Sequence, residues 1–327
     1  IWGNTTSGEL FACSDATTDE NVWTNIGSGS GDVSPYVHGA STTVFKAGGH
    51  NGSGAKFSIE AIAVSSSNGS TIIAGLAVAG SAMARASNDG HSSGYTAGGY
   101  QGSRTDQIDK FNFSTSVDAT TVASLATGRS SGEGSESRIH AYVTSSHQGQ
   151  NIITKYSMAT DSDDTSVGNL GTNNGGASAG HSTAENGYDG GAGDGTVYNK
   201  IDKYSHSNDG NSAAIADLTH YGYGLCGYSS TTHGYTSWGY STPAYFNIID
   251  RYSFASENNA TDWADLARSP DSAGGGSSTT HGFNFGGHYS GGFQKDINKF
   301  PFASQTNATD IGDLAGNVVF RPTGMNF

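Results

Sequence analysis

The sequence predicts an all-β protein, a seven-bladed β-propeller built of four-stranded antiparallel blades. Three observations lead to this prediction: a motif that returns about every 48 residues, short alternating strands within each copy, and incomplete pieces at the two ends that together make one copy. A period between about 20 and 50 residues is the signature of a repeat architecture. Alternation of apolar and polar residues between Gly, Asn and Ser is typical of strands joined by turns.

The clearest repeated element is a strand that carries Ile-Asp-Lys or Ile-Asp-Arg followed by an aromatic residue. It is seen at 107–113, 200–206 and 247–254. Its aromatic anchors are Phe111, Tyr156, Tyr204, Tyr252 and Phe300, which are separated by 45, 48, 48 and 48 residues. Ile62 and Phe11 extend the series backwards, so the sequence contains seven copies.

Two further elements complete each copy. About eleven residues after the anchor comes a bulky apolar residue with Leu or Ile three positions later, as in Trp263 and Leu266. Before the anchor comes an aromatic residue followed by small residues, as in Gly-Tyr-Thr-Ala-Gly-Gly at 94–99. A Gly/Ser-rich link leaves room for a fourth strand, and helical periodicity is nowhere sustained. Four strands in this length match a propeller blade.

We expect a single domain over residues 1–327 with one blade shared by the two ends. The complete blades are predicted near 33–76, 77–126, 127–170, 171–218, 219–266 and 267–315. Residues 1–32 offer three strands without an innermost one, and residues 316–327 form a spare segment. Pairing these two pieces in one blade would close the propeller and remove an open sheet edge.

Composition excludes several classes of function. The chain has 15 Lys and Arg against 29 Asp and Glu, a net charge of −14, which disfavours nucleic acid and anionic membrane surfaces as partners. The longest nearly apolar stretch, Thr71 to Ala84, is too short to cross a bilayer, so no membrane insertion is expected. The chain opens at Ile1 without an initiator Met, which indicates a processed terminus or part of a longer product.

Repeated polar residues suggest sites but have simpler explanations. His140, His233 and His281 begin equivalent strands and could form a metal or ligand ring, yet a polar residue bonded to a neighbouring strand or turn is favoured there. The repeated basic residues are expected to pair with acidic residues across strands within their own blades. They are Lys110, Lys155, Lys203, Arg251 and Lys299.

No cofactor and no catalytic site are predicted. Acidic clusters at 15–20 and at Asp161, Asp163 and Asp164 leave calcium as an alternative, although solvated Asp-rich turns are commoner. There is no Ser/His/Asp order, no activated Cys setting and no phosphate loop, so the chain is not expected to be an enzyme. The two cysteines have no spaced Cys/His partners, which argues against structural zinc.

The aromatic residues that do not repeat give the candidate binding site. Most lie in the loops that follow the Gly-Gly strands, which all reach one rim of the predicted propeller. Aromatic faces there could stack against sugar rings, with Asn, Asp and Ser for the hydroxyls; capping of the blade ends is an equal alternative. The candidates are Trp2, Tyr100, Tyr198, Trp238, Tyr240, Tyr245, Phe246, Tyr289 and Phe293.

The Gly-Gly, aromatic and Trp-bearing strands resemble Kelch or galactose-oxidase-type propeller repeats. The wording at 231–237, 248–254, 259–262, 8–13 and 22–27 further resembles repeats in structural and fibre-associated proteins of tailed bacteriophages, including marine and cyanobacterial ones. Neither Cys13 nor Cys226 lies in a motif matching a copper oxidase site. The resemblance covers essentially the whole chain.

This resemblance implies a non-enzymatic virion component that is extracellular in its setting. Its partners would be other virion proteins and a host-surface glycan or protein, recognised by the rim loops. Two alternatives stay open. One is a secreted or cell-surface lectin-like propeller of a bacterium, and the other is a glycan-active propeller enzyme, which would need a convergent carboxylate or metal constellation.

Overall fold

The computed structural model describes residues 1–3, 9–17, 21–26, 39, 42–87, 92–144, 151–171, 176–193, 197–241, 243–316 and 319–326. These residues form antiparallel β-sheets and contain no helix. Accordingly, the described part of the chain has no helix that could span a membrane. The chain divides into two compact units, Ile1–Val37 and His38–Phe327, rather than the single expected domain.

The first unit is a small three-stranded sheet. Its strands are β1 (Trp2–Gly3), β2 (Leu10–Asp15) and β3 (Val22–Asn25), in the order β1-β2-β3. Trp2 lies opposite Phe11, with ring centroids 5.1 Å apart. Phe11 is buried, whereas Trp2 is 46% exposed.

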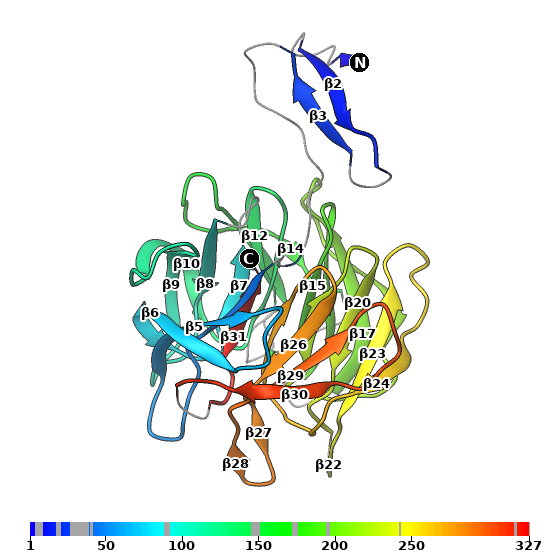
Figure 1. Cartoon of the computed structure of the whole chain (residues 1–327). Helices are drawn as coiled ribbons and strands as arrows, with labels where there is room; N and C mark the ends of the chain where they lie inside the picture. Colours follow the sequence, from blue (N-terminus) through cyan, green and yellow to red (C-terminus); the bar gives the residue numbers. More distant parts are fainter. Residues whose placement is uncertain are drawn as a thin grey trace. The chain divides into compact units, whose positions relative to one another are not determined.

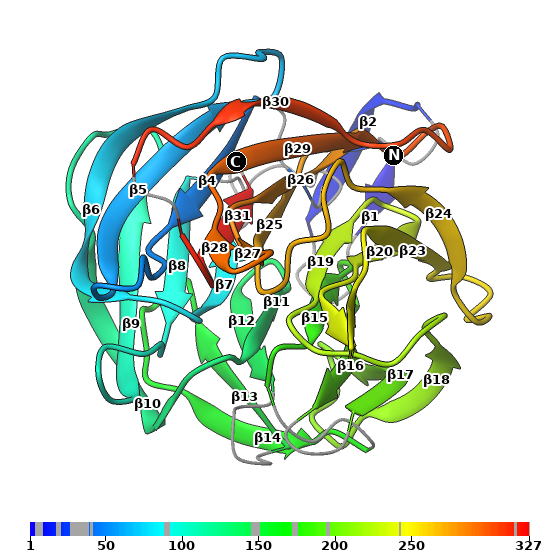
Figure 2. The same cartoon turned by 90° about the horizontal axis from the view of Figure 1, so that it is seen from below.

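The second unit contains six four-stranded antiparallel sheets, which Figure 2 shows arranged around a common centre (Figures 1 and 2). Listed from innermost to outermost strand, the first three sheets are β31 (Thr323–Asn326), β4 (Thr43–Ala47), β5 (Lys56–Ala63) and β6 (Ser70–Gly80); β7 (Ala84–Ser87), β8 (Ser93–Ala97), β9 (Thr105–Asn112) and β10 (Thr120–Arg129); and β11 (Glu133–Glu136), β12 (His140–Thr144), β13 (Ile152–Ser157) and β14 (Thr165–Asn169). The other three are β15 (Ala179–Ser182), β16 (Asn186–Gly193), β17 (Val197–Ser205) and β18 (Ala213–Asp217); β19 (Cys226–Ser229), β20 (His233–Ser237), β23 (Ile248–Ser253) and β24 (Thr261–Asp265); and β25 (Gly274–Ser277), β26 (His281–Phe285), β29 (Asp296–Pro301) and β30 (Thr309–Asp313). Two hairpins, β21–β22 (Tyr240–Ser241, Ala244–Tyr245) and β27–β28 (His288–Tyr289, Gly292–Phe293), extend from the last two sheets.

A cycle of six backbone hydrogen bonds joins the six sheets at one end. One residue, two positions before each innermost strand, donates its N–H to the carbonyl of the equivalent residue of a neighbouring sheet, over 2.7 to 3.0 Å. The six residues of this hydrogen-bonded cycle, all with positive φ between 49° and 72°, are Ala82, Ser131, Ala177, Gly224, Ser272 and Arg321. Five of them are not glycine, so the cycle holds a backbone conformation that L residues seldom adopt.

The outer strands are linked in the same order. A carbonyl at the outermost strand of each sheet accepts an N–H from the turn that precedes the outermost strand of the next sheet, as in Ala119 N to Gly75 O at 2.8 Å. The last of these bonds, from Gly69 N to Ile311 O at 3.3 Å, connects the final sheet with the first.

Glycines allow the innermost strands to approach closely. The second residue of these strands is glycine in five sheets: Gly134, Gly180, Gly227, Gly275 and Gly324. A Cβ on Gly134, for example, would overlap the backbone carbonyl of Arg85 on the neighbouring strand. In the sixth strand this position is Arg85 itself, whose guanidinium donates to Gly275 O and Gly227 O, each at 2.8 Å, and reaches the carbonyls of Gly324 and Gly180 at 3.3 and 3.5 Å. One cation therefore lies among the innermost strands and is held by their carbonyls.

The aromatic anchors form the core between successive sheets. Phe111, Tyr204, Tyr252 and Phe300 each lie directly opposite a glycine on the second strand, where a Cβ would overlap the ring. The aromatic residue next to that glycine packs against the anchor of the following sheet. For Tyr95 and Tyr156 the ring centroids are 6.0 Å apart, and for Tyr142 and Tyr204 they are 5.8 Å apart.

The predicted shared blade of residues 1–32 and 316–327 is wrong. Strand β31 pairs with β4, with Met325 opposite Phe45, while the three N-terminal strands form their own unit. The sheet of residues 43–80 supplies only three strands, so β4 has a free edge that β31 fills. Met325 is then buried beside Phe45 in one core cluster, and Gly324 permits the close approach to the neighbouring sheet. Residues 33–38, the start of the first predicted blade, lie outside the described residues.

Candidate functional site

The loops that were expected to carry the binding site do lie at one end of the second unit. Each innermost strand starts from the hydrogen-bonded cycle, so the connections between second and third strands return to the end where that cycle lies. The hairpins β21–β22 and β27–β28 belong to these connections. Figure 1 shows β22, β27 and β28 projecting from this end, and Figure 2 looks onto it.

The loops are fixed to the hydrogen-bonded cycle by backbone pairs. The residue immediately before a cycle residue pairs with the start of a loop: Tyr223 with Tyr240, Asp271 with His288, Phe320 with His50, and Ser81 with Tyr100. In the second of these pairs both N–H···O distances are 2.9 Å. The loop bases are thus positioned by the same backbone that joins the sheets, which favours a preorganised surface.

Eight aromatic side chains gather here into one surface. We call this set the aromatic face: His50, Tyr223, Tyr240, Tyr245, His288, Tyr289, Phe293 and Phe320. Neighbouring ring centroids lie 5.5 Å apart for Tyr223 and Tyr240, and 4.9 Å for Tyr240 and Tyr245. Tyr245 is 6.3 Å from Tyr289, and Phe293 is 5.7 Å from both His288 and Phe320. His50 closes the series at 6.3 Å from Phe293.

Polar groups of Asp271, His288 and Arg321 lie beside these rings, and we call them the polar floor. Asp271 Oδ1 lies 3.9 Å from His288 Nδ1 and is buried without a hydrogen-bond partner among the described residues. Arg321 Nε is also buried and unbonded within that described part, while its guanidinium lies 4.9 Å from the centroid of Phe320. A donor and an acceptor without protein partners therefore meet under an aromatic surface.

Burial sets the electrostatics of this floor. It raises the pKa of Asp271, which His288 and Arg321 oppose, and it lowers the pKa of Arg321, which Asp271 opposes. Burial, with help from Tyr240 and Asp271, raises the pKa of Tyr223, so its phenol stays a neutral donor. The site offers hydroxyl and guanidinium donors and a carboxyl acceptor next to apolar ring faces.

A small cavity of about 40 Å³ lies next to the polar floor. Its lining includes Arg321, Ser131, Ser272, Glu133 and Thr323. Because Ser131, Ser272 and Arg321 belong to the hydrogen-bonded cycle, the cavity sits where that cycle surrounds the ends of the innermost strands. It is large enough for water-sized groups only.

The structure brings together four of the nine predicted rim residues, Tyr240, Tyr245, Tyr289 and Phe293. Tyr100 lies at the same end, 45% exposed, on a groove next to the aromatic face. Tyr198 lies near the start of β17, the strand end that faces the same side. Trp2 belongs to the first unit and packs on Phe11.

Trp238 and Phe246 do not belong to the surface. Trp238 is fully buried, and its Nε1 donates to Asp250 Oδ2 at 2.8 Å. Phe246 lies 5.0 Å from His220 and packs against the same core cluster as Trp238. For these two residues the capping alternative is correct, because a hydrogen-bonded indole inside the sheet is worth more than an exposed one.

Six residues of the site had not been singled out: His50, Tyr223, Asp271, His288, Phe320 and Arg321. Most of them either directly precede a residue of the hydrogen-bonded cycle or pair with a residue that does. The signal that could have found them is the Gly-x-Ser pattern of the innermost strands, as at Gly227–Ser229, which fixes the cycle residue and hence its predecessor.

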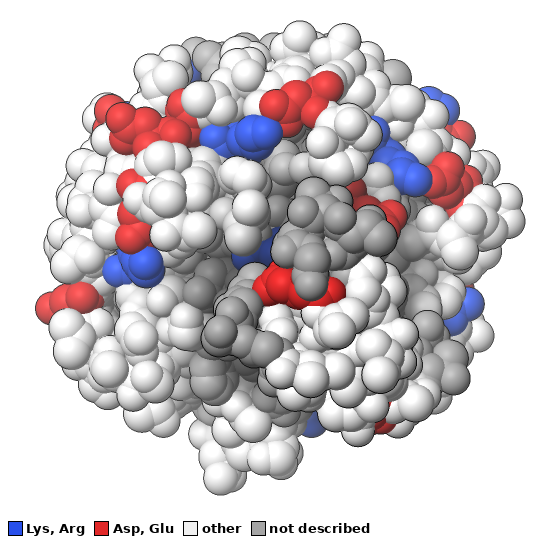
Figure 3. Space-filling view, turned by 90° about the horizontal axis from the view of Figure 1, so that it is seen from above, with Lys and Arg blue, Asp and Glu red and all other residues white. Residues whose placement is uncertain are grey.

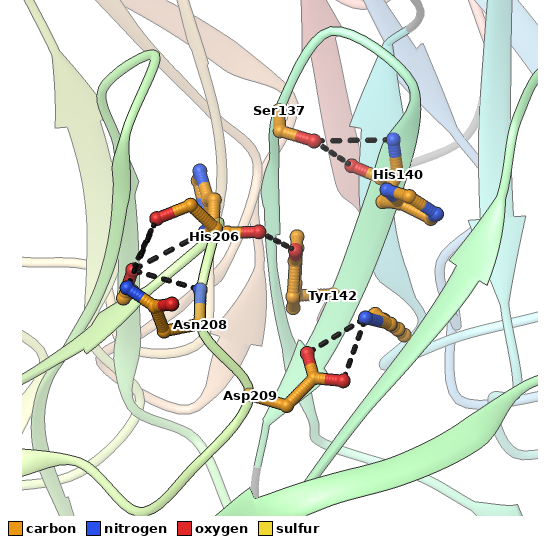
Figure 4. A network of polar contacts seen from close by, with 9 residues as sticks. Ser137, His140, Tyr142, His206, Asn208 and Asp209 are labelled. Atoms are coloured by element: carbon orange, nitrogen blue, oxygen red, sulfur yellow. Dashed lines mark hydrogen bonds and ion pairs between the residues drawn. The ribbon is translucent and has the colours of Figure 1, made fainter.

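The three aligned histidines take the simpler role that was favoured for them. They lie in three different sheets, on β12, β20 and β26. Nδ1 of His233 and of His281 each lies 2.8 Å from the hydroxyl of the preceding threonine. Figure 4 shows His140 bonded through its backbone to Ser137 Oγ, with N···O 3.1 Å, near Tyr142, whose hydroxyl donates to His206 O at 2.8 Å.

The repeated lysines pair between sheets, not within their own blades as expected. Lys110 Nζ lies 2.9 Å from Asp161 Oδ2, and Lys155 Nζ lies 2.6 Å from Asp209 Oδ1, each on the following sheet (Figure 4). Figure 3, which views the opposite end from the aromatic face, shows acidic and basic side chains side by side around its edge. Arg251 instead lies over the ring of Trp263, 3.6 Å from its centroid.

The acidic cluster at 161–164 is engaged in these inter-sheet contacts. Asp163 Oδ1 accepts from Ser124 N at 2.8 Å and Asp164 Oδ1 from Ala126 N at 2.6 Å. Among the described residues no three His, Cys, Asp or Glu side chains are grouped as a metal would require. Residues 18–20 of the other acidic cluster lie outside the described part.

No protein-family model matches this chain, and no curated protein shows a significant similarity to it.

Proposed function

We propose that the second unit is a closed six-bladed β-propeller and that its aromatic face binds a saccharide without transforming it. Two observations support closure. The hydrogen-bonded cycle returns to its starting residue after six sheets, and the outer bond from Gly69 to Ile311 joins the last sheet to the first. With no free edge left between sheets, such a scaffold holds loops rigidly.

The contiguous aromatic face above the polar floor carries the binding proposal. Saccharides present apolar C–H faces that stack on aromatic rings, and hydroxyls that need donors and acceptors in fixed directions. Tyr245 and Tyr289 provide the former, with centroids 6.3 Å apart. Asp271 Oδ1 and Arg321 Nε, which lack partners within the described part, provide the latter. Unmet polar groups at a concave surface favour a ligand that satisfies them.

The biological setting follows from the resemblance to phage fibre-associated repeats. On that basis we propose a virion component, attached to other virion proteins, whose aromatic face contacts a host-surface glycan. An acidic chain of net charge −14 with most cations paired suits an uncharged ligand better than an anionic one.

A glycan array with the purified protein tests this function. We expect binding that falls at least tenfold in Tyr245→Ala and Tyr289→Ala and that is unchanged in Val117→Ala. Val117 is 64% exposed in the β9–β10 turn, at the opposite end of the unit, and serves as the matched control. Absence of binding, or equal binding by all three variants, would refute the role of the aromatic face.

A further inference from the structure

We propose that the aromatic face continues into a second saccharide subsite, so that the ligand is an extended, uncharged oligosaccharide. The second subsite is the groove between the loop of residues 50–55 and the loop of residues 100–102. This inference rests on the proposed function and adds to it the length and charge of the ligand.

The groove is large and its walls are built by two successive sheets. Its volume is about 450 Å³, and its lining includes His50, Gly52, Phe57, Tyr100 and Gln101. His50 and Gly52 come from the β4–β5 loop, and Tyr100 and Gln101 from the β8–β9 loop. A volume of this size accepts a sugar unit, in contrast to the small cavity beside the polar floor.

Short-range hydrogen bonds fix both loops before any ligand arrives. In the first loop Gly52 N donates to His50 Nδ1 at 3.0 Å, and Lys56 N donates to Gly49 O at 2.8 Å. In the second, Gln101 N donates to Ser103 O at 2.9 Å. Because the walls are already ordered, binding loses little conformational freedom.

The groove is continuous with the aromatic face through His50 and Phe293. The Phe293 ring packs on Gly52, where a Cβ would come within 3.0 Å of it. From Tyr245 the path runs over His288 at 6.2 Å, Phe293 at 5.7 Å and His50 at 6.3 Å between successive centroids. Evenly spaced rings along a path offer a platform to the successive units of a linear chain.

The chemistry of the groove suits an uncharged sugar. None of the ten described residues that line it is Asp, Glu, Lys or Arg. Phe57 and Tyr100 are 54% and 45% exposed, which leaves two apolar ring faces open to a ligand. Gln101, Ser53 and His50 supply donors and acceptors for hydroxyl groups.

The test is calorimetric titration with linear maltooligosaccharides and cellooligosaccharides of two to seven units. For the series that binds, we expect affinity to rise with length until both subsites are filled. Phe57→Ala and Tyr100→Ala should lose about tenfold for the longest member and leave the disaccharide unchanged. Tyr289→Ala should weaken every member of the series, and thermal unfolding should show all variants folded.

The outcomes separate the two proposals. If short and long members bind equally, or if Phe57→Ala and Tyr100→Ala bind the longest member like the wild type, the second subsite is refuted and the first stands. If neither series binds and the glycan array is also blank, the proposed function fails, and the extended ligand with it.

Discussion

Replacing Glu133 with glutamine should stabilise the second unit at neutral and alkaline pH. Glu133 begins β11, and its side chain lines the small cavity beside the polar floor. Burial raises the pKa of its carboxyl to about 8; Arg85 opposes the rise, Asp189 adds to it, and the Gly180 N–H opposes it. The folded protein therefore holds a proton that the unfolded chain releases near its ordinary pKa of 4.5.

The sign and size of the effect follow from proton linkage. Below pH 4.5 both states carry the proton and the contribution to stability is complete. As pH rises towards 8 the unfolded state binds fewer protons than the folded state, so stability is lost by up to about 1.4 kcal/mol per pH unit. Over the whole interval this amounts to at most about 5 kcal/mol. Glutamine has nearly the same shape and no charge, so Glu133→Gln should remove this loss.

Urea unfolding between pH 4.5 and 8.5 measures it. We expect the stabilities of wild type and Glu133→Gln to be similar at pH 4.5 and to diverge as pH rises, with the variant more stable. Glu185→Gln, which removes a carboxyl from an exposed site, should follow the wild type. Parallel curves for Glu133→Gln and wild type, or a variant that is less stable at pH 8, would refute the reasoning.

Two further substitutions test how the sheets are joined. Arg85→Met removes hydrogen bonds to the carbonyls of the innermost strands and should lower the free energy of unfolding by about 3 kcal/mol, whereas Lys295→Met, at a 50% exposed site, should change it by less than about 0.5 kcal/mol in the same urea titration. Met325→Asp places a carboxylate in the core beside Phe45 and should cost more than about 3 kcal/mol in thermal unfolding; an unchanged melting temperature would show that β31 does not complete that sheet.

The repeat and its core could be predicted from the sequence because they are local and periodic. Phe111 lies opposite Gly94 in one sheet and Phe300 lies opposite Gly282 in another, so one pairing rule serves several sheets. The place of the C-terminal strand could not be predicted in the same way. Thr323–Asn326 is four residues long, and its pairing depends on which distant edge is free. The recurring glycine of the innermost strands, present at Gly324, was the one local sign of it.

The candidate site could be predicted only in part. Tyr240, Tyr245, Tyr289 and Phe293 stand out because no other repeat has an aromatic residue at their positions. Trp238 stands out for the same reason, but its indole turns into the core to bond Asp250, and composition does not reveal that direction. Asp271 and Arg321 lie fifty residues apart in links between sheets, so only the joining of the sheets brings them together.

The pairing of β31 with β4 has a consequence for synthesis on the ribosome. Strand β4 emerges early, whereas β31 emerges only after some 270 further residues have been translated. During that time the nascent chain displays an unprotected strand edge, which is the kind of surface that recruits foreign strands or chaperones. The last four described residues thus act as a latch, and translation must reach them before the molecule is safe from self-association.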